Sequence, residues 1–154
     1  MEAPKIPRES WATHPNYPSQ ILLLGSHENF RMVQRMVEQK VADPSRPLAD
    51  AAYLFERWMA AMSNHEAYEE RKLYPFLVHR WNVDLGHLVA GHEALAARKN
   101  TVREAFRAED RELSLAAVKE FGSTLFTHLE LEEDAVIPLL LSLSPSEFRR
   151  YYDS

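Results

Sequence analysis

Two stretches share the pattern His-x-x-x-Glu-Glu-x-x-x-x-Pro: His65-Glu-Ala-Tyr-Glu69-Glu70-Arg-Lys-Leu-Tyr-Pro75 and, later, His128-Leu-Glu-Leu-Glu132-Glu133-Asp-Ala-Val-Ile-Pro138. On an α-helix, residues four apart lie one turn above each other. Each copy therefore points one imidazole and one carboxylate the same way. A His-Glu pair also precedes each copy, at His27-Glu28 and at His92-Glu93. The chain is predicted to form two similar helix pairs, each offering two histidines and one carboxylate, which is a set of metal ligands.

Composition indicates one ordinary globular domain of 154 residues, with 45% hydrophobic and 27% charged residues. The net charge of −5 gives no basic surface for nucleic acid or anionic membranes, so neither is expected as a partner. Cysteine is absent, which excludes disulfides, thiolate ligands and a cysteine nucleophile.

Neither a signal peptide nor a membrane span is apparent in the sequence. The first residues lack the apolar core of a signal peptide, and no apolar run approaches the roughly 20 residues that a span requires. The cytoplasm is therefore the expected location.

Residues 1–18 are predicted to form an N-terminal arm, and residues 19–154 the helical domain. The arm has no helical periodicity and is rich in proline, which favours an extended segment. Trp11 and Tyr17 indicate that its second half docks on the domain. The prolines are Pro4, Pro7, Pro15 and Pro18.

Apolar residues at helical spacing predict four long helices. The first runs over 19–42 with Ser19 as its N-cap. The second runs over 48–80 and is expected to kink or loosen near 71–75, because Pro75 cannot continue the hydrogen-bond ladder. The third covers about 85–108, and the fourth begins near 112 and continues past Pro138. Ser144-Pro-Ser-Glu147 is a capping box that starts a short terminal helix ending near Tyr151.

The short connections make consecutive helices antiparallel. The expected fold is all-α: an up-down-up-down four-helix bundle with the N-terminal arm and a short C-terminal helix. In the last segment Phe148, Tyr151 and Tyr152 either cap the bundle or form the contact of a homodimer.

The metal interpretation has simpler competitors. A single histidine on an apolar stripe is usually a core residue bonded to a backbone carbonyl, and a single His–Glu pair at this spacing is usually a surface ion pair. Repetition argues against both, because four histidines lie on the apolar faces of four helices. Two buried carboxylates without a partner would cost several kcal/mol each, and a cation between them removes that cost. Four imidazoles and two carboxylates exceed a tetrahedral zinc site, but they suit two ions that share bridging carboxylates.

The order His…His-x-x-x-Glu…His…His-x-x-x-Glu over residues 20–143 resembles the hemerythrin-like family, also called the HHE cation-binding domain. The resemblance implies a non-haem di-iron site with an oxo, hydroxo or water bridge, in which manganese or zinc could replace iron. It further implies that one iron is held by His27 and His65, the other by His92 and His128, and that Glu69 and Glu132 bridge the two.

One departure from the oxygen carriers of this family affects the functional prediction. Those proteins have a fifth histidine, in a His-x-x-x-His pattern on the third helix. Here the positions four before and four after His92 are Leu88 and Ala96, and His87 is about 140° away on a regular helix. The predicted site is symmetric, with two histidines per iron. This resembles members linked to iron sensing, nitric-oxide handling or iron–sulfur repair, although the repair proteins usually carry a cysteine-bearing segment.

Three classes of function follow from this site. The protein reacts with peroxide or nitric oxide as an enzyme, or it binds or senses O2, NO or iron without turnover, or the metal only stabilises the fold. Glu70 and Glu133 are expected to face solvent, because they lie about 140° from the histidine of their motif. The alternative is that they support the ligands from behind. Tyr68 either faces the metals or is a core aromatic. The sequence leaves open whether Glu28, Glu66, Glu93 or a backbone carbonyl orients the imidazoles.

Overall fold

The computed structural model describes residues 2–154, which form helices and no β-strand within that range. The short elements near the start are a 3-10 turn at Arg8–Ser10 and α1 at Tyr17–Gln20. The main helices follow in the order α2 Leu22–Ala42, α3 Leu48–Tyr68, a π-helical segment Glu69–Leu73, α4 Tyr74–Trp81, α5 Gly86–Arg107, α6 Arg111–Leu141 and α7 Pro145–Asp153.

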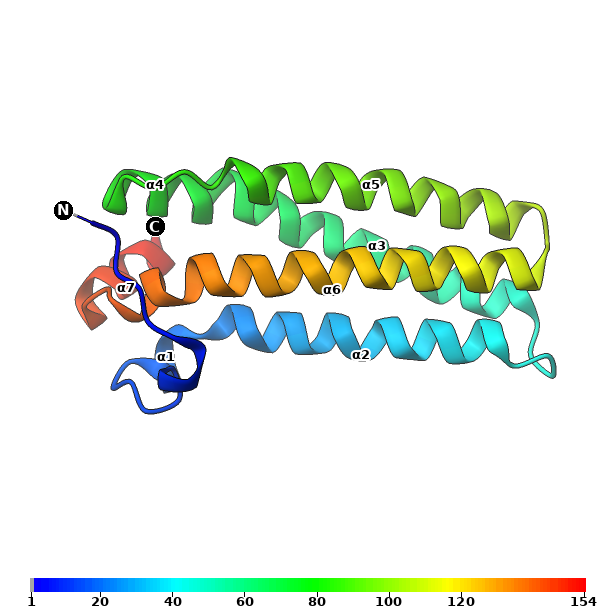
Figure 1. The fold of residues 1–154 in the computed structure, drawn as a ribbon, viewed down its shortest axis with the longest axis horizontal. Coiled ribbons are helices and arrows are strands. Elements are labelled where there is room, and N and C mark those ends of the chain that lie inside the picture. The colour runs from blue at the N-terminus through cyan, green and yellow to red at the C-terminus, as the bar shows by residue number, and fades with distance from the viewer. Residues whose placement is uncertain (1) are drawn as a thin grey trace.

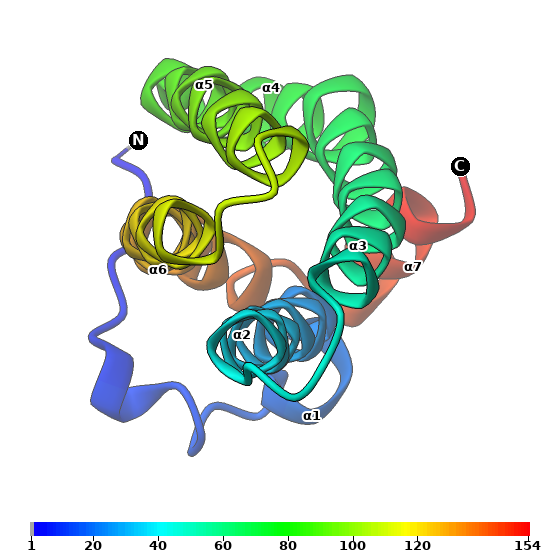
Figure 2. The ribbon, with the colours of Figure 1, turned by 90° about the vertical axis from the view of Figure 1, so that its right-hand side faces the viewer.

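Helices α2, α3, α5 and α6 run along the long axis of the molecule (Figure 1) and surround a common centre when viewed end-on (Figure 2). The N-terminal arm, α1, α4 and α7 gather at one end, opposite the α2–α3 and α5–α6 connections. This arrangement is compatible with the expected up-down-up-down order. None of the described helices is both long and apolar enough to cross a membrane.

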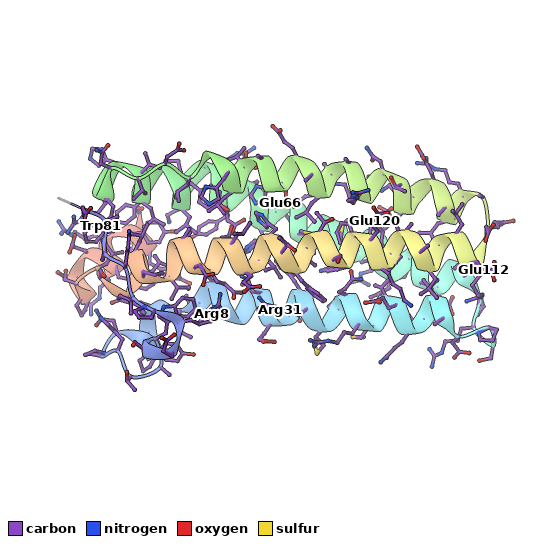
Figure 3. The ribbon with its side chains drawn as sticks, viewed as in Figure 1. Arg8, Arg31, Glu66, Trp81, Glu112 and Glu120 are labelled. Carbon is purple, nitrogen blue, oxygen red and sulfur yellow. The ribbon has the colours of Figure 1, made fainter. Side chains whose placement is uncertain are left out.

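The core consists of two apolar clusters separated along the bundle. One fills the end near the two connections and includes Phe55, Trp58 and Phe121. The other fills the end near the arm and includes Leu77 and Ile137. In Figure 3, Trp81 marks one end of the bundle, Glu112 the other end, and Glu66 the region between them.

The helices pass from one cluster to the other at the histidines and carboxylates of the repeated motif. On α2, His27 lies between Leu23 of one cluster and Phe30 of the other. On α5, His92 lies in the same way between Leu88 and Leu95. The candidate ligands therefore form a polar layer with apolar side chains on both sides.

The loosened turn predicted before Pro75 is present as the π-helical segment Glu69–Leu73. Proline has no N–H, and its ring collides with the carbonyl four residues earlier in a regular helix, here that of Arg71. A wider turn relieves that collision, and such turns are frequent at functional sites. The predicted second helix is thus three consecutive elements, α3, the π segment and α4.

The predicted start of the first helix at Ser19 is wrong. Ser19 lies inside α1, and the chain breaks at Ile21 before α2 begins. The buried side chain of Gln20 donates through Nε2 to the carbonyls of Leu140 (2.6 Å) and Leu143 (3.1 Å). These bonds fix α1 against the end of α6 and separate it from α2.

The last two helices begin where the sequence predicted, near residue 112 and after Ser144. The side chain of Asp110 caps α6 by accepting from the Leu113 amide at 3.0 Å. The predicted capping box at Ser144 and Glu147 is present at the start of α7. From α7, the buried Tyr151 packs on Phe76 with ring centroids 4.6 Å apart, so this helix covers one end of the bundle.

Two helical glycines provide a matched test of this packing. A Cβ at Gly122 would collide with the amide of the buried Gln34, whose Nε2 donates to the Val118 carbonyl at 2.9 Å. A Cβ at Gly25 would have no heavy atom within 4 Å. We expect Gly122→Ala to lower the free energy of unfolding by about 1–3 kcal/mol. Gly25→Ala should leave it unchanged or raise it by up to about 1 kcal/mol. Chemical denaturation of both variants measures the difference, and equal effects would contradict this account of the packing.

Candidate metal centre

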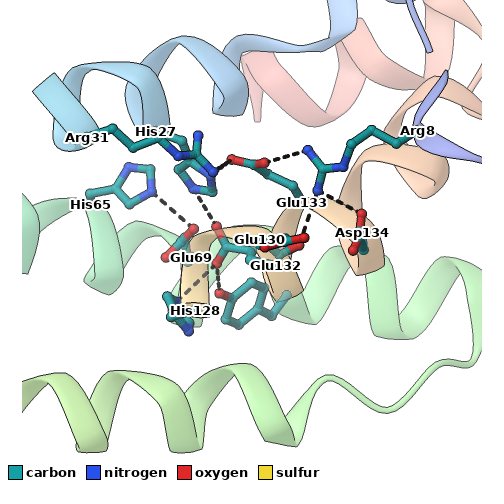
Figure 4. Close-up of polar contacts among 11 residues, drawn as sticks. Arg8, His27, Arg31, His65, Glu69, His128, Glu130, Glu132, Glu133 and Asp134 are labelled. Carbon is teal, nitrogen blue, oxygen red and sulfur yellow. Dashed lines mark hydrogen bonds and ion pairs between the residues drawn. The ribbon is translucent and has the colours of Figure 1, made fainter. Parts of the chain in front are cut away.

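Four helices and the π segment bring the six predicted side chains to one place in the polar layer. Figure 4 labels those of His27, His65, Glu69, His128 and Glu132. Among possible ligand atoms, those of His27, His65, Glu69 and Glu132 lie within 4.8 Å of one another. Those of His92, His128 and Glu132 form a second such group. We call these the His27–His65 half and the His92–His128 half of the centre.

Each carboxylate reaches both halves, one oxygen to each. Glu69 has Oε2 at 3.1 Å from Nε2 of His65 and Oε1 at 3.1 Å from Nε2 of His92. Glu132 has Oε1 at 2.8 Å from Nε2 of His27 and Oε2 at 3.8 Å from Nε2 of His128. All four imidazoles present the same nitrogen to the centre. This geometry suits two cations joined by two carboxylates.

Several atoms of the centre are buried without a hydrogen-bond partner in the described part of the chain. They are Nε2 of His27, Nε2 of His92 and Oε1 of Glu132. The short His27–Glu132 distance does not have hydrogen-bond geometry. Buried polar atoms are normally paired, because leaving one unpaired costs free energy. These atoms face the interior of the ligand set, where a cation would satisfy them together.

The space between the ligands is small. The cavity that all six residues line has a volume of about 10 Å³. That is about enough for one water-sized sphere, so an organic molecule does not fit there. Ions bound at the distances typical of His and carboxylate ligands do not need a larger cavity.

The outer nitrogens of two imidazoles are held by carboxylates, and the expectation of solvent exposure was wrong for one of them, Glu133. Glu133, expected in solvent, is buried, and its Oε2 accepts from Nδ1 of His27 at 2.7 Å. Glu70 is exposed, but its Oε2 accepts from Nδ1 of His92 at 2.8 Å. Both carboxylates thus reach a histidine on a neighbouring helix, Glu133 from a buried position and Glu70 from an exposed one. Such bonds fix the ring and leave the other nitrogen for a metal.

Two further residues shape the centre and were not found from the sequence. The hydroxyl of the buried Tyr74 donates to Oε2 of Glu132, and its ring stacks on His92 with centroids 6.0 Å apart. Gly91 lies beneath the ring of His128, where any Cβ would collide with Nδ1. The only sequence signal for Tyr74 was its place before Pro75. Nothing in the sequence pointed to Gly91.

Tyr68 does not face the ligands. Its hydroxyl forms a hydrogen bond with that of Tyr151, and its side chain is partly exposed. With His65 it lines a cavity of about 480 Å³ between α2, the π segment and α7. A second surface cavity, of about 490 Å³, reaches His128 between α5 and α6. Each half of the centre thus has one histidine next to a surface cavity.

The buried charges shift the protonation of the ligands strongly. Burial opposes the charged form of His27 and His92, but the carboxylates next to each ring outweigh it and raise the pKa of each to about 9. Burial and the positive charge of His92 lower the pKa of His128 to about 4. Burial and the nearby Glu69 raise the pKa of Glu132, which favours its protonated form. These protons occupy the positions that a metal would take.

One comparison with known proteins identifies the family of this chain. The model of the family described as Hemerythrin HHE cation binding domain matches residues 22–140, which is more than half of the chain. The chain matches no curated protein and no solved structure at the significance required.

The metal-free protein should lose stability as the pH rises. His27 and His92 have folded pKa values of about 9 against an ordinary 6.5, so each stabilises the fold fully below pH 6.5. That stability is lost as the pH rises through 9, on the order of a few kcal/mol in total. Denaturation of chelator-treated protein at pH 6.5 and at pH 9.5 measures it. Glu133→Gln, which removes the carboxylate on His27, should flatten the slope. A metal-free protein that is equally stable at both pH values would contradict these pKa shifts.

Proposed function

Because this chain belongs to the hemerythrin HHE cation-binding domain family, we propose that it is a non-haem di-iron protein that reacts with, or senses, O2, NO or peroxide. The proposal includes an up-down-up-down four-helix bundle as its scaffold. The observation that carries it is the pair of carboxylates, Glu69 and Glu132, each of which has one oxygen toward either half of the centre.

The ligand assignment follows the two halves. His27 and His65 would hold one ion, and His92 and His128 the other. Glu69 and Glu132 would bridge them, which accounts for two carboxylates being buried in an otherwise apolar bundle. The imidazole and carboxylate donors suit iron, with manganese or zinc as substitutes.

The ions would supply redox and Lewis-acid chemistry when bound. The protein's own residues supply the rest. Tyr74 holds a proton between its hydroxyl and Glu132. The two apolar clusters exclude water from both sides of the polar layer. The cavities beside His65 and His128 offer a small molecule a route to each half.

The surroundings of His92 support reaction or sensing over oxygen carriage. Leu88 belongs to an apolar cluster, and Ala96 is exposed. His87 is exposed and outside the ligand groups. It lines the cavity that reaches His128, but no residue within 2–154 adds a fifth histidine to the ligand groups. Two histidines per ion leave coordination positions for an exogenous molecule.

Removing a bridging carboxylate should weaken both ions together. We expect Glu69→Gln and Glu132→Gln each to weaken the binding of both ions by at least about tenfold. Replacing a ligand should weaken metal binding at least as much as replacing a residue that only bonds to a ligand. Elemental analysis of protein purified with iron measures ions per chain. Glu130→Gln is the control, because Glu130 is exposed on the same helix as Glu132. A Glu69 variant that lost only one ion would contradict the bridging assignment.

The proposed chemistry is tested on iron-loaded protein prepared without oxygen. We expect its optical and electron paramagnetic resonance spectra to change when O2, NO or hydrogen peroxide is added, because open positions admit small molecules. Zinc-loaded protein is the control, since zinc is redox-inert. Repeated consumption of peroxide would identify an enzyme, and one stoichiometric change a sensor. Spectra that no addition altered would leave the metal a structural role and overturn the proposal.

A further inference from the structure

The carboxylate of Glu133 connects the N-terminal arm to a histidine of the centre. We propose that Arg8, a residue of the arm, is a positioning residue that acts through Glu133 on His27. It would thereby strengthen metal binding in the His27–His65 half alone. This inference rests on the proposed metal function, which it extends by making the two halves unequal.

Three donors converge on the two oxygens of Glu133 (Figure 4). Nη1 of Arg8 donates to Oε1 at 2.9 Å. Nη2 of Arg31 lies 2.9 Å from Oε2, the oxygen that also accepts from Nδ1 of His27 at 2.7 Å. Arg31 comes from α2, one turn after His27, whereas Arg8 comes from a segment more than a hundred residues away from Glu133. Both arginines lie beside α6 in Figure 3.

Glu133 needs both arginines because it is only 1% exposed. A buried carboxylate without partners costs several kcal/mol, and bonds from guanidinium groups are among the strongest compensations. Arg31 and His27 share Oε2, so Arg8 alone satisfies Oε1 among the described residues. Without Arg8, Oε1 is left unpaired, and the carboxylate turns toward water. Its Oε2 then no longer fixes the His27 ring.

The arm holds Arg8 in place by contacts of its own. The guanidinium lies over the ring of the buried Trp11, 4.5 Å from the centroid, and its Nη2 donates to Oδ1 of Asp134 at 2.7 Å. Trp11 in turn donates from Nε1 to the Ile6 carbonyl at 2.9 Å. Arg8 is therefore fixed on both sides before it contacts Glu133. The contact does not depend on chance ordering of a free side chain.

The His92–His128 half has a different arrangement. Glu70, which accepts from Nδ1 of His92, has a side chain that is 42% exposed. No arginine or lysine pairs with Glu70 in the described part of the chain. Water can solvate this carboxylate, so its hold on His92 needs no further residue but is also less rigid. Loss of Arg8 should leave this half unchanged.

The experiment titrates metal-free protein with Fe(II) in the absence of oxygen and resolves the two binding steps by calorimetry. We expect Arg8→Gln to weaken one step by about tenfold, the low end of the range for residues behind a ligand. Glu70→Gln should weaken the other step. Arg103→Gln is the matched control, because Arg103 pairs with Glu56 at 2.7 Å on the surface away from the centre. An Arg8→Gln effect no larger than that of Arg103→Gln, or equal on both steps, would overturn the proposal.

A second measurement uses the metal-free protein and so does not depend on the proposed function. Nuclear magnetic resonance of 15N-histidine-labelled protein detects the Nδ1 proton that His27 shares with Glu133. We expect a slowly exchanging signal in the unaltered protein, faster exchange in Arg8→Gln, and no change in the corresponding signal of His92. If the unaltered protein bound no iron, the proposed function would fail while this signal still tested the arm. Unchanged exchange in Arg8→Gln would refute the role of Arg8.

Discussion

The structure depends on one costly feature, the burial of histidines and carboxylates in a layer between two apolar clusters. Such a layer interrupts the hydrophobic core, and three of its inward-facing atoms have no hydrogen-bond partner among residues 2–154. A stable fold of this kind needs a counter-charge within the layer. The layer also explains the repeated motif. Helices α2, α5 and α6, and α3 with its continuation into α4, contribute to both apolar clusters, so each must place polar residues at the same level between them.

The charges around the layer are balanced if two divalent ions are present. Glu69 and Glu132 lie between the halves, and Glu70 and Glu133 lie behind His92 and His27. These four carboxylates would neutralise two divalent ions while every imidazole stayed neutral. Of the two arginines on Glu133, Arg8 also pairs with Asp134. On the side of the arm, charged contacts therefore continue from the core through Glu133 and Arg8 to Asp134 at the surface. On the other side, they end at the exposed carboxylate of Glu70.

The sequence predicted what depends on spacing within one helix. The all-helical class, the capping box at Ser144 and the disturbed turn before Pro75 follow from local patterns and agree with the structure. The grouping of the six side chains followed from repetition. The sequence offered Glu70 and Glu133 as partners of the histidines only as an alternative to solvent exposure, because they face other helices and only packing brings those close. The contact of Arg8 with Glu133 could not be predicted at all, since the arm has no periodicity from which to predict its path.

The repeat also conceals a difference that only the structure makes visible. Before its proline, the first motif has Tyr74 and the second has Ile137. The first proline follows a π-helical segment, whereas the second lies inside the regular helix α6. The wider turn changes the direction of the residues that follow it. Tyr74 then bonds Glu132, the carboxylate of the other motif, while Ile137 is buried in an apolar cluster and has no polar group to offer Glu69. Two motifs with identical spacing therefore build a centre whose bridging carboxylates have different surroundings, and this inequality adds to the one that the arm imposes on the histidines.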